Sequence, residues 1–146
     1  MNLLHISMDR QRLDVALIHR FLSTEAYWSQ GIALETVQRA IAGSLCFGGY
    51  LDGDRQVAFG RVITDSATFA YLADVFVLPE YRGQGYARQL MAAIMAYPQL
   101  QGLRRFMLTS SFAQGLYAQF GFAALATPHT LMEKRPVNGD VSGKPS

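Results

Sequence analysis

Residues 75–87 read Val-Phe-Val-Leu-Pro-Glu-Tyr-Arg-Gly-Gln-Gly-Tyr-Ala, a pattern that predicts a strand, a glycine-rich turn and the start of a helix. The first N–H groups of a helix have no partners within it, and the helix dipole adds partial positive charge at the same end. Gly83 and Gly85 carry no side chains, so an anion can approach the backbone closely. Ala87 stays small where a larger side chain would crowd the turn. The stretch therefore predicts a site for pyrophosphate or a similar anion.

Two other glycine-rich phosphate signatures do not fit this turn. A P-loop ends in Gly-Lys-Ser or Gly-Lys-Thr, and the chain contains neither run. A dinucleotide fingerprint needs a third small residue three positions after its second glycine, where this chain has Arg88 after Gly85. That fingerprint also usually follows the first strand of a fold, whereas this turn follows the fourth predicted strand.

The elements beside the turn alternate between strands and helices. Residues 68–77 are apolar on both faces, as is typical of a central strand covered by helices on each side. After Gly85, apolar residues recur at helical spacing until Pro98 stops the helix. Further along we expect a strand, a short helix and two more strands, at residues 103–109, 114–120, 122–125 and 129–133.

The first half of the chain predicts two helices and a hairpin. Asp52-Gly53-Asp54 supplies a tight turn between two strands at residues 45–51 and 56–63. Before the hairpin we expect a strand, a helix capped by Asp9, a loop and a second helix, at residues 3–6, 10–21, 23–31 and 34–41. The order β-α-α-β-β-β-α-β-α-β indicates a mixed α/β fold with helices on both faces of the sheet.

The composition suits one domain with a substantial core. Half of the 146 residues are hydrophobic and 16% are charged. A net charge of +2 gives little support for a nucleic-acid partner, which usually needs a concentrated basic face. The chain start lacks the pattern of a signal peptide, and no apolar run approaches the roughly 20 residues that cross a bilayer, so we expect a cytoplasmic protein without a membrane partner. We expect residues 1–134 to form the domain and residues 135–146 a disordered tail.

The turn resembles the acetyl-coenzyme A site of the GNAT superfamily of N-acetyltransferases. The family pattern, Arg/Gln-x-x-Gly-x-Gly/Ala, is met by Arg82, Gly85 and Ala87. A second signature, a tyrosine followed by three residues and Gly-Phe, is met by Tyr117 to Phe122. The resemblance covers roughly residues 2–134, more weakly over the first 44. It implies a central mixed, mostly antiparallel sheet of six to seven strands with helices on both faces, and it leaves open a homodimer, which is common in the family.

The resemblance also assigns roles around the cofactor. Tyr117 matches the tyrosine that protonates the departing coenzyme A thiolate, and a phenol of pKa about 10 can do so at neutral pH. Many members have an asparagine seven positions before it, where this chain has Ser110, whose hydroxyl can replace part of that contact. The residues expected to contact the cofactor, those of the fourth strand through their main chains, are Val75, Phe76, Val77, Arg82, Gly83, Gln84, Gly85, Tyr86, Ala87, Ser110 and Tyr117.

The acceptor amine must lose a proton before or during attack. Asp74 lies in an otherwise apolar strand beside the turn, so it is either the general base or a structural carboxylate bonded to its neighbours. In this family the loop between the first two helices often borders the acceptor pocket, and here it carries Tyr27 and Trp28, which either contact substrate or cover the core. Tyr71 is a weaker candidate for substrate binding. Cys46 has no basic neighbour in sequence, and the three histidines have no metal-ligand spacing, so we expect neither a thiol nucleophile nor a metal site.

Two functions remain open from the sequence. The first is an N-acetyltransferase that moves the acetyl group of acetyl-coenzyme A to a primary amine by direct attack in a ternary complex. The second is a non-catalytic module that binds or senses acetyl-coenzyme A, which needs the turn but not Tyr117. The acceptor, either a small molecule or a peptide amine, cannot be read from the residues.

Overall fold

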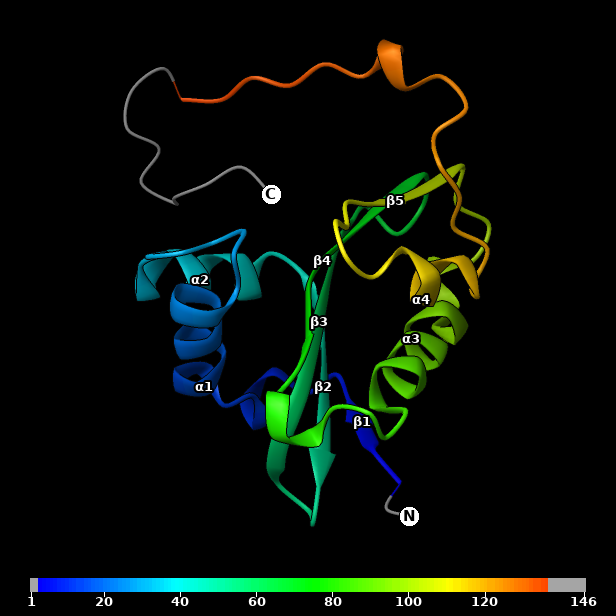
Figure 1. Ribbon diagram of the computed structural model, residues 1–146. Helices are drawn as coiled ribbons and strands as arrows, with labels where there is room; N and C mark the ends of the chain where they lie inside the picture. The colour runs from blue at the N-terminus through cyan, green and yellow to red at the C-terminus, as the bar shows by residue number, and fades with distance from the viewer. Residues whose placement is uncertain (1–2, 137–146) are drawn as a thin grey trace.

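A single five-stranded sheet organises the computed structural model, which describes residues 3–136 (Figure 1). Its strands follow the order of the chain, and each neighbouring pair is antiparallel except the last, in which β4 and β5 run parallel. The strands are β1 His5–Ser7, β2 Leu45–Leu51, β3 Arg55–Thr64, β4 Phe69–Val77 and β5 Arg105–Leu108. The parallel pair places both strand ends at the same edge, where a site can form.

Helices cover both faces of the sheet, as the sequence predicts (Figure 1). One face carries α1 and α2, and the other carries α3 and α4. Their bounds are α1 Val15–Arg20, α2 Leu34–Ala42, α3 Tyr86–Ala96 and α4 Gln114–Ala118. The expected capping by Asp9 was wrong for the helix: its carboxylate caps a short 3₁₀ turn at Arg10–Arg12, and the carboxylate of Asp14 accepts the N–H of Leu17 to cap α1.

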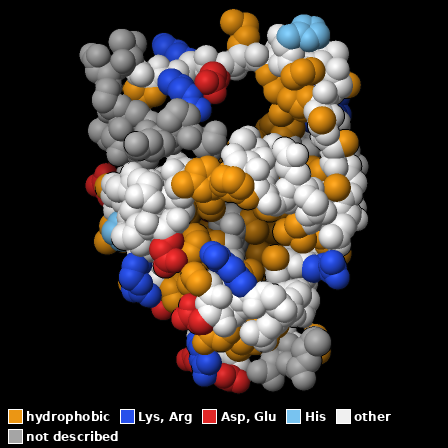
Figure 2. Space-filling view, viewed as in Figure 1, with side chains coloured by type: hydrophobic (Ala, Val, Ile, Leu, Met, Phe, Trp, Pro, Cys, Tyr) orange, Lys and Arg blue, Asp and Glu red, His pale blue; other side chains and the backbone are white. Residues whose placement is uncertain are grey.

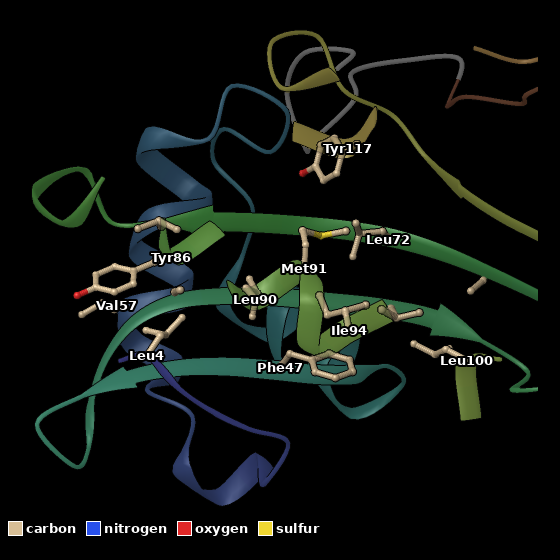
Figure 3. Packing of buried hydrophobic residues seen from close by; sticks show 14 of the residues in the cluster. Leu4, Phe47, Val57, Leu72, Tyr86, Leu90, Met91, Ile94, Leu100 and Tyr117 are labelled. Carbon is tan, nitrogen blue, oxygen red and sulfur yellow. The ribbon is translucent and has the colours of Figure 1, made fainter. Parts of the chain in front are cut away.

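Two hydrophobic clusters fill the spaces between the sheet and its helices. On one face of the sheet, the buried residues Leu90, Met91 and Ile94 of α3 pack on β2, β3 and β4 (Figure 3). On the opposite face, Ile18 and Phe21 from the α1 side pack with Val37 and Ile41 of α2, and with Phe59 and Phe76 of the sheet. Since both faces of β3 and β4 are covered, most residues of these strands are apolar, which explains the pattern of residues 68–77.

A bulge in β4 changes which side chains face which layer. Phe59 pairs with Phe76 and Arg61 pairs with Ala73, so β4 has one more residue than β3 across this interval. Asp74 lies in the bulge and adopts a φ of 56°, which is uncommon for a residue with a side chain. The irregularity breaks the strict alternation of side chains between the two faces of β4, at the position of the Asp74 carboxylate.

The parallel pair of β4 and β5 is short. It extends from Phe69 opposite Arg105 to Leu72 opposite Leu108, after which β4 continues to Val77 without β5 beside it. The two strands therefore diverge at Leu72. The backbone edge of β4 beyond that point is open to an extended ligand, which can bind it as a further strand would.

The expectation of six to seven strands was wrong, because the sheet has five in the described part of the chain. Residues 122–125 and 129–133 were expected as the last strands but have no strand pairing in residues 3–136. Their residues from 123 onward are exposed, and residue types alone do not make a segment pair with a neighbouring edge. Of the expected tail, residues 137–146 lie outside the described residues.

Candidate active site

A cavity of about 730 Å³ opens where β4 and β5 diverge. Its floor is β4 from Tyr71 to Phe76, and its walls come from residues 25–28 before α2, from the end of β5 and from α4. Figure 2 shows this face of the molecule hollowed between the two helical layers, with hydrophobic side chains gathered around the opening. The cavity thus lies on the strand edge that β5 leaves unpaired.

The predicted anion turn lies next to this cavity and has the expected geometry. Gly83 and Gly85 adopt φ angles of 79° and 84°, a region that favours glycine. Gly85 is the residue before α3, and no side chain caps the helix. Within residues 3–136, the backbone N–H groups of residues 83–88 donate no hydrogen bond. Six consecutive donors at a helix N-terminus can bind an anion.

A hollow of about 350 Å³ lies in front of these donors. Arg82, Gly83, Gly85 and Ala87 line it, as expected from the sequence, and Arg82 also lines the main cavity. Gln84 is exposed, and its N–H belongs to the same row. The side chain of Tyr86 is buried in the core, so this residue can offer only its main chain to a ligand.

Arg82 connects the turn to the strand. Its Nε donates to the carbonyl oxygen of Val77 at 3.0 Å, which fixes the side chain between the hollow and the cavity. The side chains of Val75 and Val77 pack into the α3 cluster, and that of Phe76 packs into the cluster on the other face. Therefore these three residues can contact a ligand in the cavity chiefly through their main chains.

Tyr117 projects from α4 toward β4 at the cavity wall (Figure 3). Only 8% of the residue is exposed, and its ring makes an edge contact with Phe122. Burial, with a smaller contribution from Tyr27, raises the pKa of the Tyr117 phenol. A phenol with a raised pKa stays protonated at neutral pH, so Tyr117 can donate a proton to a ligand in the cavity.

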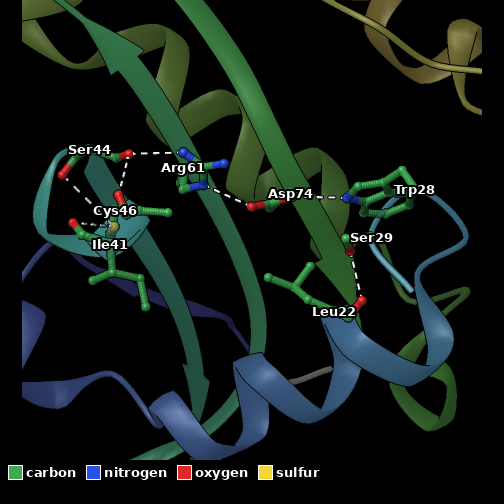
Figure 4. A network of polar contacts seen from close by, with 9 residues as sticks. Leu22, Trp28, Ser29, Ile41, Ser44, Cys46, Arg61 and Asp74 are labelled. Atoms are coloured by element: carbon green, nitrogen blue, oxygen red, sulfur yellow. Dashed lines mark hydrogen bonds and ion pairs between the residues drawn. The ribbon is translucent and has the colours of Figure 1, made fainter. Parts of the chain in front are cut away.

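Asp74, on the floor of the cavity, is held between two donors (Figure 4). The indole Nε1 of Trp28 donates to one carboxylate oxygen at 2.9 Å, and Nε of Arg61 donates to the other at 2.8 Å. Arg61 also donates to the hydroxyl of Ser44. Both Asp74 and Arg61 are mostly buried, and charges in such a place need a partner. Asp74 thus has the partners that a structural carboxylate needs, and it still faces the cavity.

The indole and two neighbouring rings form an aromatic wall. Tyr27 makes edge contacts with Trp28 at 5.1 Å between ring centroids and with Phe112 at 5.4 Å. Phe112 is 86% exposed and lies in the loop after β5. All three rings line the cavity, together with the carboxylate of Glu25, so this end of the cavity combines aromatic surface with acidic groups.

Two further predicted residues lie where β5 ends. The hydroxyl of Tyr71 donates to Oγ1 of Thr109 at 2.8 Å, which ties β4 to the end of β5 at the cavity. Ser110 lines the cavity, and its Oγ accepts the N–H of Ala113 at 2.9 Å, so it helps to start α4. The Ser110 hydroxyl keeps its own proton free to donate to a ligand.

Several residues of the cavity were not predicted from the sequence, among them Arg61 and Phe112. Arg61 is the one charge within the apolar run 57–63, and that signal could have suggested a buried partner such as Asp74. Phe112 had no periodic signal, because it lies in an irregular loop. Its contact with Tyr27 joins segments 85 residues apart, which no local pattern reveals.

Neither a thiol nor a metal cluster faces this cavity in the described residues. Cys46 is buried on β2 behind Arg61, where its thiol donates to the carbonyl oxygen of Ile41 (Figure 4). Desolvation raises the pKa of the thiol, which disfavours the nucleophilic thiolate. Residues 3–136 contain no group of three or more His, Cys, Asp or Glu side chains placed to hold a metal ion, and none of their helices is long and apolar enough to cross a membrane.

Known proteins share both the sequence pattern and the fold. The family model of the acetyltransferase (GNAT) domain matches residues 42–124, which include β2 to β5, the anion turn and Tyr117. A Gibberella zeae protein described as a proposed acetyltransferase is 30% identical over 136 residues, covering 78% of this chain and 75% of its own.

Solved structures extend the similarity to nearly the whole chain. A crystal structure of a proposed GNAT-family acetyltransferase from Xanthomonas campestris is 59% identical, with a TM-score of 0.90 over 93% of this chain and 95% of its own. A structure from Clostridium acetobutylicum, of a protein predicted to be an acetyltransferase and solved with acetyl-coenzyme A, shares the fold at 16% identity, with a TM-score of 0.66 over 92% and 96% of the two chains. With more than half of its length matched by the family model, this chain belongs to the GNAT family and is an acyltransferase.

Proposed function

We propose that the protein transfers the acetyl group of acetyl-coenzyme A to a primary amine by direct attack in a ternary complex. One observation carries the proposal: the six free N–H groups of residues 83–88 and the buried phenol of Tyr117 border two hollows that share Arg82 in their lining. The first group fits the pyrophosphate of coenzyme A. The second fits the departing thiolate, and the open edge of β4 runs between them.

The open edge of β4 suits the pantetheine arm. Backbone groups of residues 73–77 can hydrogen-bond its amides as a neighbouring strand would, because β5 has diverged from β4 there. A backbone N–H in this stretch can also polarise the thioester carbonyl. Ser110, on the opposite side of the opening, offers a hydroxyl to the same ligand.

The chemistry then needs two proton movements. The amine nitrogen attacks the acetyl carbonyl carbon, the C–N bond forms, and the C–S bond breaks. The departing thiolate, of intrinsic pKa about 8.5, takes the phenolic proton of Tyr117. Asp74 accepts the proton lost by the amine, directly or through water, and solvent later restores both groups. Since the only cysteine lies outside the cavity, the acetyl group passes directly to the amine.

The acceptor occupies the end of the cavity bordered by Tyr27, Trp28 and Tyr71. Aromatic faces attract cations, and the Glu25 carboxylate adds negative charge, so this end favours a positively charged amine over an anionic one. Trp28 is held in place by its bond to Asp74, which joins acceptor binding to the proposed base.

Release of free coenzyme A thiol, measured across a panel of amines, tests the proposal. We expect turnover above the slow hydrolysis background with at least one primary amine, and the acetylated amine should appear by mass spectrometry in equal amount. The panel should span polyamines, amino acids, aminoglycosides and peptide amines. The lining of the cavity favours a positively charged acceptor but does not select its length. Tight binding of acetyl-coenzyme A with no turnover on any amine would contradict the proposal and favour a binding module.

A further inference from the structure

The aromatic wall of the cavity is a row of three rings set nearly at right angles. The ring planes of Tyr27 and Trp28 meet at 90°, and those of Tyr27 and Phe112 meet at 77°. Rings at such angles form corners, in which an ammonium group can lie against more than one aromatic surface. The row begins at Trp28, which is bonded to Asp74 (Figure 4), and ends at the exposed ring of Phe112. It therefore leads from the proposed base to solvent.

Glu25 brings negative charge to this end of the cavity. The charged side chains that line the cavity are those of Glu25, Arg61, Asp74 and Arg82. Arg61 and Asp74 form an ion pair, and Arg82 also lines the hollow in front of the anion turn, where a pyrophosphate would bind. Within residues 3–136 the carboxylate of Glu25 has no ion-pair partner. A cation at this end would find an aromatic surface and a carboxylate together.

Hydrogen bonds hold residues 25–28 in place. Nε2 of Gln30 donates to the carbonyl oxygen of Thr24 at 3.0 Å. The hydroxyl of Ser29, which is buried, donates to the carbonyl oxygen of Leu22 at 2.7 Å. A site on such a segment keeps its shape before the substrate arrives, so binding loses little free energy to the ordering of the loop.

The nucleophilic nitrogen itself is a poor occupant for this surface. Attack on the thioester needs a neutral amine with a free electron pair, whereas aromatic faces and a carboxylate stabilise the ammonium form. A nucleophile bound there as a cation would be held in its unreactive state, and binding energy of that kind does not lower the barrier. A second positive charge, separate from the reacting nitrogen, can bind to the same surface without this cost.

We propose that the acceptor is a linear diamine or polyamine. One nitrogen is acetylated beside Asp74 and Tyr117, and the bonds made and broken are those of the proposed acetyl transfer. A second nitrogen, still protonated, lies against the rings of Tyr27 and Phe112 with Glu25 as its counter-ion. The methylene groups between the two nitrogens lie along the apolar surface of the rings. This inference rests on the proposed function and names its substrate class.

Calorimetric titration of the enzyme saturated with coenzyme A tests the second charge without any reaction. The titrants are linear diamines from diaminobutane to diaminooctane, each compared with the alkylamine of the same chain length. The members of such a pair differ by one ammonium group, so their common methylene groups cancel. We expect the Kd of at least one diamine to be lower than that of its alkylamine by about tenfold or more. No difference in any pair would overturn the proposal.

Glu25→Gln and Phe112→Leu test the two parts of the site. Each should reduce the ratio of diamine affinity to alkylamine affinity by about threefold or more, because one removes the counter-ion and the other the aromatic face. Phe112→Tyr should keep the wild-type ratio, since the ring remains. Glu35→Gln is the matched control, because Glu35 is an exposed carboxylate of α2 outside the cavity. A wild-type ratio in both Glu25→Gln and Phe112→Leu would contradict the assignment.

Steady-state acetylation of the same amines separates this inference from the proposed function. A higher kcat/KM for diamines than for alkylamines would support both. Selective binding of diamines with no acetyl transfer to any amine would contradict the proposed function, while the site for a second cation would stand. Equal kcat/KM for diamines and alkylamines would overturn the diamine preference and leave acetyl transfer intact.

Discussion

Asp74→Asn is expected to lower kcat for amine acetylation by about 10²–10⁴-fold, the usual contribution of a positioned general base. The asparagine has nearly the same shape and can still accept the indole N–H of Trp28, so the aromatic wall should stay in place. What it loses is the charge that pairs with Arg61 and the ability to take a proton from the amine. Steady-state kinetics with a reactive amine measures the loss.

The pH dependence separates a base from a positioning role. Without a base, only the neutral amine reacts, so kcat of Asp74→Asn should rise about tenfold per pH unit up to the amine pKa. The wild type should depend less steeply on pH in that range. Trp28→Phe is the matched control: it keeps an aromatic ring but removes the donor to Asp74, and should affect KM for the amine more than kcat. A wild-type pH profile and a kcat within about threefold in Asp74→Asn would assign Asp74 a structural role.

Tyr117→Phe is expected to lower kcat by about 10²-fold or more while the Kd of acetyl-coenzyme A changes little. The phenylalanine keeps the packing against Phe122 and loses only the hydroxyl that would protonate the thiolate. Because burial raises the pKa of the Tyr117 phenol, the wild type should keep this proton donor up to pH 10. Rapid-quench experiments measure the rate of acetyl transfer. Titration calorimetry measures the Kd of acetyl-coenzyme A.

The control for this variant is Tyr27→Phe. Tyr27 lines the same cavity and also lies between aromatic neighbours, but it is not assigned a proton-transfer role. It should keep kcat within a few fold of the wild type. If Tyr117→Phe turned over at the wild-type rate, another group or water would have to protonate the thiolate.

The conformation of the glycine-rich turn could be predicted from the sequence because its determinants are local. Gly83 and Gly85 allow the positive φ angles, and the row of free N–H groups follows from a helix that starts without a side-chain cap. The strand before the turn and the helix after it could also be predicted, because the spacing of their apolar residues matches the layers that they contact. The position of Tyr117 followed from its short signature beside Gly121-Phe122.

The remaining parts depend on contacts between distant segments. The bulge at Asp74 arises from how β3 and β4 pair, and no spacing within β4 announces it. The pairing of Arg61 with Asp74 and the contact of Phe112 with Tyr27 also join separate elements. For residues 122–125 and 129–133 strands were expected from the sequence, but a strand forms only where it pairs with a neighbouring edge, and in the described residues neither segment pairs with β5.

A crystal structure with coenzyme A bound would show whether the turn and Tyr117 hold the cofactor. We expect pyrophosphate oxygens within hydrogen-bond distance of backbone N–H groups in residues 83–88, and the thiol sulfur within reach of the Tyr117 hydroxyl. The pantetheine arm should lie along β4 from residue 73 onward, where β5 has diverged. Coenzyme A bound elsewhere, or a sulfur directed away from Tyr117 and the 730 Å³ cavity, would contradict it.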